Sequence, residues 1–236
     1  MIRFIDARKL LPTHPTKEFE RREVEEILGG VIHHTAGDDT PHNTAAYHVG
    51  PNHISSTGCP GLCYSFYITK SADIHWANDI ESITWSQSSN RKYLAIVCGG
   101  DFSKESPTFA QVFALLSLWA HLTGKSRSPI IPDELYSILH CSINAIYGHH
   151  NFGKPACPGI VLETLVDGFR SRLNKFSTDS DWQSALNKAG ATLVVDGIWG
   201  PLSKEALLEF QEKTENLVAD GVRGPLSEAS LIKATS

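Results

Sequence analysis

Near its C-terminus the chain repeats an eight-residue segment, which indicates a small folded unit at that end. Asp196-Gly-Ile-Trp-Gly-Pro-Leu-Ser203 recurs 24 residues later as Asp220-Gly-Val-Arg-Gly-Pro-Leu-Ser227, with six identical positions. In each copy the glycines indicate a turn, and the serine is the expected N-cap of a helix. Apolar residues at helical spacing also precede the first copy, around Trp182. Three short helices of this kind bury one small core together.

A polar stretch over residues 175–181 precedes this unit and has the composition of a linker. We therefore predict two domains, residues 1–175 and residues 176–236, with the repeat inside the second. The first has a length that is usual for a single domain.

The N-terminal domain alternates strand-like and helix-like segments. Apolar runs predict strands over residues 30–36, 64–69 and 93–98. Apolar residues at helical spacing predict helices over residues 109–122 and 160–176. Strands interleaved with helices are typical of an α/β fold, in which helices pack against the faces of a central sheet.

The composition excludes several classes of partner. The chain has 21 Lys and Arg against 26 Asp and Glu, a net charge of −5 with histidine neutral. Nucleic acid is not an expected partner, because phosphate binding needs a clustered basic face. No apolar run approaches the roughly 18 residues of a membrane span. The charged N-terminal residues 1–15 lack the apolar run of a secretion signal.

Histidine and cysteine give the first indication of chemistry. Eleven histidines are unusual for this length and indicate metal or acid–base chemistry. The five cysteines are an odd number, so at least one has no partner within the chain. Without a secretion signal a disulfide framework is not expected, and free thiolates are potential zinc ligands.

Three potential metal ligands stand at strand ends or in loops. His33 follows the apolar part of a predicted strand, and a loop rich in Gly and Pro separates His149 from Cys157. Two imidazoles and one thiolate fill three tetrahedral positions and leave the fourth for water, as in catalytic zinc sites. Neighbouring strand residues face opposite sides, so only one of His33 and His34 can point to the site. On spacing alone, packed core residues are the commoner interpretation of such side chains.

Four segments carry a more specific signal. They are Val31-Ile-His-His-Thr-Ala36, Tyr64-Ser-Phe66, Asn90 with Gly100-Asp-Phe102, and Gly148-His149 followed after seven residues by Cys157-Pro-Gly159. Together they resemble the zinc-dependent N-acetylmuramoyl-L-alanine amidases, which include phage amidase-type lysozymes and animal peptidoglycan recognition proteins. The resemblance covers most of residues 20–170. It implies a central mixed β-sheet flanked by helices.

The resemblance also implies a site and a reaction. It makes His33, His149 and Cys157 the ligands of one Zn²⁺ per chain and places Tyr64 in the active site. His33 is preferred over His34 because the family ligand directly follows the apolar pair of the strand. The implied reaction is hydrolysis of the amide between the lactyl group of N-acetylmuramic acid and L-alanine of the peptidoglycan stem peptide. Without the resemblance, Tyr64 is an ordinary strand tyrosine with a hydrogen-bonded hydroxyl.

Three positions depart from the family pattern. The family usually has Lys or Thr two residues before the cysteine ligand, but here Pro155 stands there, and Lys154 is the candidate for that catalytic role. The strand over residues 93–98 lacks the carboxylate that some relatives use at its end. Trp85 or Ser86 stands where many relatives have a substrate-facing histidine.

The loop between His53 and Cys63 offers a second set of ligands. A second metal or a Cys59–Cys63 disulfide is conceivable there, but the spacing is short and a fourth ligand is absent. We favour a structural loop that lines a groove. His48 lies on a predicted helix and, by the resemblance, could contact the substrate.

The C-terminal repeat resembles the small helical peptidoglycan-binding module that is often fused to cell-wall hydrolases. Both resemblances imply bacterial peptidoglycan as the partner. Without a secretion signal a phage or prophage endolysin fits best, and a delivered antibacterial effector would have the same sequence features. A monomer is the default expectation for a tethered hydrolase. An endolysin of this kind is made in the cytoplasm without a signal peptide and acts at the bacterial cell wall after release. Two alternatives stay open: a non-catalytic peptidoglycan recognition protein, and a zinc endopeptidase that cuts within the stem peptide.

Overall fold

The computed structural model describes residues 2–37, 40–172, 176, 178–215, 217, 219–221, 223 and 225–235. The chain divides into two compact units, one with Met1–Leu115 and Ile138–Asp167, the other with Leu116–Ser137 and Gly168–Ser236. The domain boundary predicted at residue 175 lies outside the described residues, as does part of the predicted linker. The two predicted domains therefore stay a prediction.

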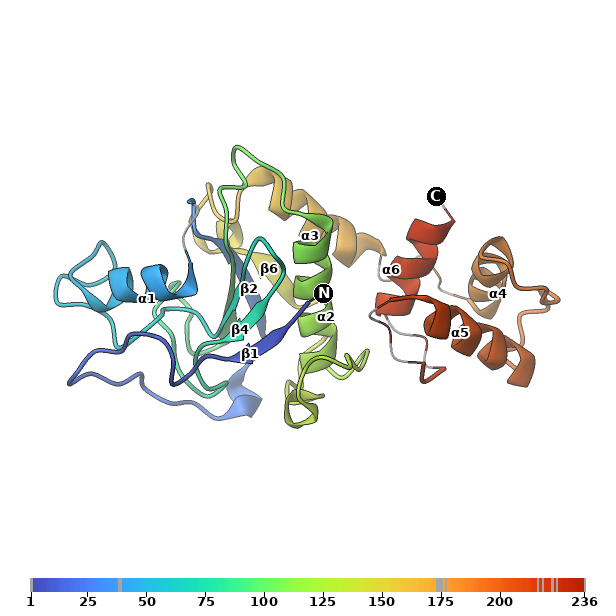
Figure 1. Ribbon diagram of the computed structural model, residues 1–236, viewed down its shortest axis with the longest axis horizontal. Helices are drawn as coiled ribbons and strands as arrows, with labels where there is room; N and C mark the ends of the chain where they lie inside the picture. The colour runs from blue at the N-terminus through green and yellow to red at the C-terminus, as the bar shows by residue number, and fades with distance from the viewer. Residues whose placement is uncertain are drawn as a thin grey trace. The chain divides into compact units, whose positions relative to one another are not determined.

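Among the described residues, six strands form one mixed sheet in the first unit (Figure 1). They are β1 (Phe4–Asp6), β2 (Gly29–His34), β3 (Phe66–Ile68), β4 (Ile74–Trp76), β5 (Tyr93–Cys98) and β6 (Ile146–Gly148). Their order across the sheet is β1-β4-β3-β5-β2-β6. Neighbouring strands run parallel except β3 and β4, which are antiparallel. The expected mixed sheet is confirmed.

The two long strands β2 and β5 lie side by side and are buried over most of their length. Val31 and Ile32 of β2 and Ile96 of β5 have no exposed surface. Continuous apolar runs of this kind are typical of strands that are covered on both faces. The strand predicted over residues 93–98 has these bounds, whereas the one predicted over 64–69 begins only at Phe66.

Helix α1 (Pro41–Val49) lies on one side of the sheet (Figure 1). Its N-cap is Thr40, whose hydroxyl accepts the backbone N–H of Asn43, and Pro41 occupies the first turn, where no N–H is needed. On its inner face Ala45 belongs to a buried cluster with Tyr67 and Val97 of the sheet. This cluster fixes α1 beside the carboxyl ends of β3 and β5.

Helices α2 (Phe109–Leu122) and α3 (Ile160–Arg172) begin at the predicted residues. The first turns of α2 lie against the sheet, where the side-chain amide of Gln111 donates to the carbonyls of Ile68 and Gly99. Leu162 and Val166 form the buried side of α3. No helix within the described part of the chain is long and apolar enough to cross a membrane.

In the second unit, α4 (Asp179–Lys188) packs against α5 (Pro201–Lys213) and α6 (Pro225–Ala234). The expected group of three C-terminal helices is therefore present. Its buried core consists of Trp182, Ala185, Leu186, Leu207 and Leu231.

The predicted serine caps are wrong. Helix α5 begins at Pro201 after the N-cap Gly200, and α6 begins at Pro225, so Ser203 and Ser227 lie inside their helices. Proline is well suited to the first helical position because its fixed φ matches the helix and its missing N–H is not needed there. Both serines are buried instead.

The structure explains why the eight-residue segment repeats. The buried amide of Gln183 donates to the side chains of Asp196 at 2.7 Å and Ser203 at 3.2 Å, and it accepts the N–H of Gly197 at 3.0 Å. The second copy has the same three bonds, from Gln211 to Asp220, Ser227 and Gly221. The aspartate, glycine and serine of each copy therefore satisfy one buried glutamine, as a buried polar side chain requires.

Candidate metal centre

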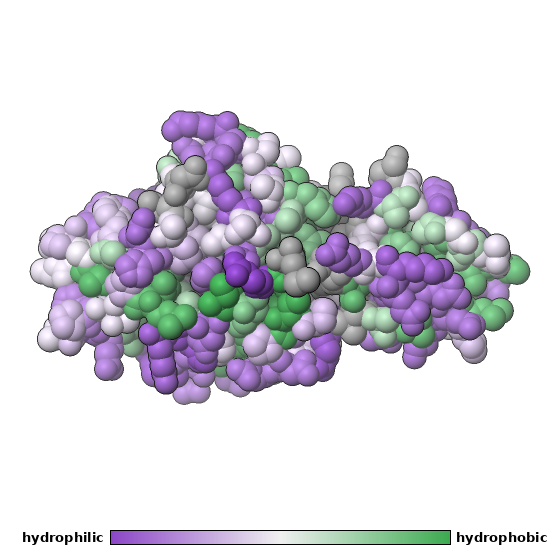
Figure 2. Space-filling view, viewed as in Figure 1, coloured by the Kyte–Doolittle hydropathy of each residue, from purple (hydrophilic) through white to green (hydrophobic). Residues whose placement is uncertain are grey.

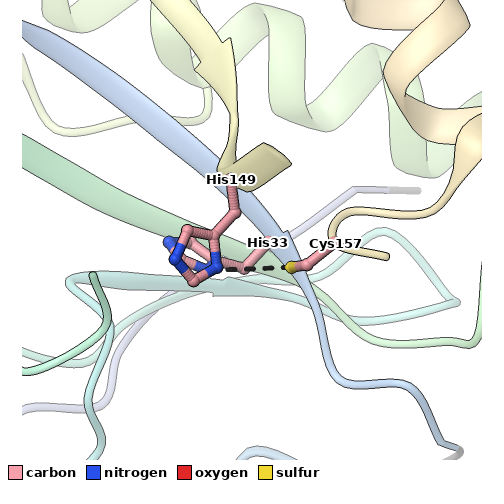
Figure 3. Close-up of side chains that lie close together, drawn as sticks. All are labelled: His33, His149 and Cys157. Atoms are coloured by element: carbon pink, nitrogen blue, oxygen red, sulfur yellow. Dashed lines mark hydrogen bonds between the residues drawn. The ribbon is translucent and has the colours of Figure 1, made fainter. Parts of the chain in front are cut away.

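Strand pairing brings two histidines to one edge of the sheet. Strands β2 and β6 run parallel with Ile32 opposite Gly148, so the next residues, His33 and His149, leave the same edge together. Their ring centroids are 4.3 Å apart (Figure 3). Both side chains are nearly completely buried.

The loop after His149 returns a cysteine to the same point. A short 3₁₀ helix over His149–Phe152 ends at Gly153, whose φ of 86° lies in the left-handed region that favours glycine. The N–H of Cys157 then donates to the carbonyl of Lys154 at 2.9 Å and closes a turn. The Cys157 sulfur lies 3.9 Å from Nδ1 of His33 (dashed line in Figure 3).

We call these three side chains the ligand group. They have the donor atoms and the spacing of a zinc site. One ligand atom from each of His33, His149 and Cys157 lies within 4.8 Å of the others. Zinc binds histidine nitrogen at about 2.0–2.1 Å and thiolate sulfur at about 2.3 Å, so a small closure lets one ion contact all three. Among the described residues, this is the one group of three or more such side chains that close together.

Burial sets the protonation states of this group. Burial lowers the pKa of His33 well below its ordinary value, with a further contribution from His149. Burial, followed by the charge of Lys154, lowers the pKa of His149 to about 4. Burial raises the pKa of the Cys157 thiol to about 11, against a hydrogen bond from the backbone of His34 that lowers it. Near pH 7 both imidazoles are neutral ligands, and the thiol must release a proton to bind a metal.

His34 does not belong to the ligand group. Its Nδ1 accepts the backbone N–H of Phe102 at 3.3 Å, and its ring lies 6.2 Å from the Phe102 ring. Of the pair, His33 lies with His149 and Cys157, and His34 points to Phe102.

Tyr64 lies beside the ligand group. Its ring centroid is 5.1 Å from that of His33 and 5.6 Å from that of His48 on α1. Its carbonyl accepts the side-chain amide of Asn78 at 2.7 Å, which fixes the backbone just before β3. Burial, followed by the nearby Cys157, raises the pKa of Tyr64. The phenol is therefore protonated at neutral pH and available as a hydrogen-bond donor.

The ligand group lines a cleft of about 1030 Å³. Tyr64 and Lys154, the two predicted catalytic residues, line the same cleft. Aromatic and polar side chains form its walls, among them Tyr47, His48, His53, Trp85 and Ser86. None of its described lining residues is acidic, which agrees with the missing carboxylate at the end of β5.

The loop before Tyr64 has a structural role in the described residues. Cys59 and Cys63 are buried, free thiols. The backbone N–H of Cys63 donates to Nδ1 of His48 at 3.1 Å, which ties the loop to α1. No second ligand group forms here within the described part of the chain.

Sequence reasoning missed one residue of the site. The side-chain oxygen of Gln87 lies 3.0 Å from Nε2 of His33, on the far side of the ring from Cys157. Gln87 stands in a polar segment without periodicity or a known motif, so the sequence alone contained no signal for it.

Comparison with known proteins identifies the family of this chain. The family described as N-acetylmuramoyl-L-alanine amidase matches residues 23–160, a range that includes His33, Tyr64, His149 and Cys157. No curated protein sequence matches the chain.

Several solved structures share the fold. The Ph2119 endolysin from Thermus scotoductus MAT2119 bacteriophage Ph2119 is 20% identical, with 70% of this chain and 96% of that chain covered and a TM-score of 0.51. Drosophila PGRP-LB is 18% identical, with 70% and 93% covered and a TM-score of 0.52. Peptidoglycan recognition protein-LE, solved with tracheal cytotoxin, is 19% identical, with 70% and 92% covered and a TM-score of 0.55. At these identities the likeness shows the fold.

The protonation states predict how zinc affinity depends on pH. Above about pH 5 His149 is already neutral, whereas the Cys157 thiol, with a pKa of about 11, still carries its proton. Binding therefore releases about one proton, and the zinc association constant should rise about tenfold per pH unit between pH 6 and 8. Competition with a chromophoric chelator at pH 6, 7 and 8 measures this slope.

Two cysteine variants identify the thiol that causes the pH dependence, with Cys98→Ala as the control. Cys157→Ala should bind zinc weakly and lose the slope, whereas Cys98→Ala, which removes a buried thiol outside the cleft, should retain both. A pH-independent affinity of the unmodified protein would contradict Cys157 as a ligand that binds with loss of its proton.

Proposed function

Because the chain belongs to the N-acetylmuramoyl-L-alanine amidase family, we propose that it hydrolyses the amide between the lactyl group of N-acetylmuramic acid and L-alanine in peptidoglycan. The observation that carries the proposal is the convergence of His33, His149 and Cys157 on one point. These residues lie within the segment that the family matches, and they line a cleft of about 1030 Å³.

The proposed cofactor is one Zn²⁺ per chain. Two neutral imidazoles and one cysteine form a donor set that suits zinc and leaves a coordination position for substrate or water. Zinc bound in this way supplies Lewis-acid chemistry, which activates water near neutral pH and polarises the scissile carbonyl.

Tyr64 is proposed to stabilise the transition state. Attack on an amide carbonyl places negative charge on its oxygen, and a fixed donor in a partly dry site lowers the energy of that charge. Tyr64 stays protonated because burial raises its pKa, and the rings of His33 and His48 hold it in place. Its hydroxyl is therefore proposed as the hydrogen-bond donor to this oxygen.

Lys154 is proposed to contribute a positive charge at the same cleft. It is exposed, it lines the cleft, and its charge helps to lower the pKa of His149. It stands one residue earlier than the family's usual Lys or Thr. The Cys157 N–H donates to the Lys154 carbonyl and closes a turn, and through this turn Lys154 is proposed to take the same role.

The charge of the cleft favours a substrate with free carboxylates. Its described lining contains Lys154 and several histidines but no acidic side chain, although the whole chain carries a net charge of −5. Stem peptides of peptidoglycan carry carboxylates, which such a lining accepts without like-charge repulsion. Trp85 and Tyr47 offer flat apolar surface for the sugar or the peptide.

The C-terminal helices are proposed to bind the cell wall. Val194, Ile198 and Leu202 expose 77%, 67% and 71% of their surface, which is high for apolar residues around one turn. Figure 2 shows hydrophobic surface at the end of this unit where α4 connects to α5. A wall-binding unit joined to the hydrolase would raise its effective concentration at an insoluble substrate. This organisation fits a phage or prophage endolysin acting at the cell wall.

The bond that is cut is tested by mass spectrometry of purified peptidoglycan digested with the zinc-loaded protein. We expect stem peptides with a free N-terminal L-alanine and glycan chains that are otherwise intact. New termini between two amino acids would instead identify a zinc endopeptidase. Binding to peptidoglycan without any new terminus would identify a recognition protein, and either result would contradict the proposal.

The role of Tyr64 is tested by Tyr64→Phe, which removes only the hydroxyl. Loss of one oxyanion donor typically lowers kcat by about 10²–10³-fold, and we expect a decrease in this range with zinc affinity unchanged. Tyr136→Phe is the matched control, since its hydroxyl bonds to the carbonyl of Gly124 outside the cleft. Steady-state turnover of a soluble muramoyl peptide gives kcat, and equal kcat values for Tyr64→Phe and the control would remove Tyr64 from the mechanism.

A further inference from the structure

The His33 ring has a hydrogen-bond partner on the side away from the other ligands. The side-chain oxygen of Gln87 lies 3.0 Å from Nε2 of His33, and the Ser86 hydroxyl donates to the same oxygen at 2.6 Å. Gln87 is 9% exposed, so water does not readily replace this partner. Neither Gln87 nor Ser86 is among the three ligand residues.

The surroundings fix which end of the Gln87 amide faces His33. On its other side the amide lies 3.4 Å from the backbone carbonyl of Tyr93, which can only accept a hydrogen bond. The NH₂ group therefore faces Tyr93, and the oxygen faces His33. Because an amide oxygen can only accept, Nε2 of His33 must carry the proton.

This arrangement selects one tautomer of the ligand. A neutral imidazole with its proton on Nε2 has its lone pair on Nδ1, and Nδ1 is the atom that faces the Cys157 sulfur at 3.9 Å. We infer that Gln87 is a positioning residue that holds His33 in the tautomer and ring orientation that binds the metal. The inference rests on the zinc site of the proposed function.

Hydrogen bonds within the protein fix the loop that carries Gln87, and none of them involves a metal. The side-chain oxygen of Asn90 accepts the backbone N–H groups of Ser86 at 3.0 Å and Gln87 at 2.9 Å. The buried guanidinium of Arg22 then joins both ends of the loop through backbone carbonyls, those of Ile80, Asn90, Arg91 and Tyr93. Tyr93 also begins β5 and pairs with β2, the strand that carries His33. The acceptor and the ligand are thus attached to neighbouring strands.

Outer partners of metal-bound histidines typically change metal affinity by about 10–100-fold when they are removed. We therefore expect Gln87→Leu to raise the Kd for Zn²⁺ by this factor, measured by competition with a chromophoric chelator. Gln87→Glu keeps an acceptor opposite Nε2 and should bind zinc more tightly than Gln87→Leu. Ser86 and Asn90 remain unchanged in both variants.

Gln111→Leu is the matched control for the loss of a buried amide. Gln111 bonds to the carbonyls of Ile68 and Gly99 and does not line the cleft. Gln111→Leu and Gln87→Leu should both lower the midpoint of thermal unfolding, but Gln111→Leu should leave the Kd for Zn²⁺ at the wild-type value. Equal Kd values for Gln87→Leu and the wild-type protein would overturn the positioning role.

A second measurement uses the wild-type protein, so its result does not depend on whether the Gln87 variants fold. Long-range ¹H–¹⁵N spectra of the metal-free wild-type protein report the tautomer of His33, assigned by the loss of its signals in His33→Asn. A proton on Nε2 supports the inference, and a proton on Nδ1 overturns it. If the wild-type protein bound no zinc, the metal site itself would fail, whereas zinc binding with the wrong tautomer would overturn only the role of Gln87.

Discussion

The parallel pairing of β2 with β6 is the constraint on which the candidate site depends. With Ile32 opposite Gly148, His33 and His149 emerge at one edge of the sheet. Strand β2 is buried on both faces, so its register is strongly fixed. A slip by one residue would turn His33 toward Phe102 and bring His34 to the ligand group, because neighbouring side chains alternate in direction. The register of the sheet therefore fixes the relative positions of His33 and His149.

Local pattern was enough to predict several parts of this structure. The apolar run over residues 93–98 and the helix starting at Phe109 have their predicted positions, because buried strands and apolar helices are encoded by residues close in sequence. The proximity of His149 and Cys157 also followed from local sequence, since glycine and proline turn the short loop between them. The position of His33 beside them was predicted from the family resemblance. It depends on which strands are neighbours in the sheet, and no single segment of the sequence determines that order.

Other parts could not be predicted, for identifiable physical reasons. Gln87 acts through a hydrogen bond to a residue 54 positions away, and its own segment has no pattern that marks it. The serines of the repeat were expected to be helix caps, but the preceding prolines begin the helices, and the serines bond to buried glutamines. In both cases the side chain serves a tertiary contact that competes with its local preference.

Activity in the proposed form requires that two imidazoles, fixed by sheet register and by a buried amide, share a single ion with one sulfur. X-ray absorption at the zinc edge of the loaded protein tests this claim most directly. The account predicts two histidine nitrogens at about 2.0–2.1 Å, one sulfur at about 2.3 Å and one further light atom. A zinc shell without sulfur, or with fewer than two histidines, would contradict it.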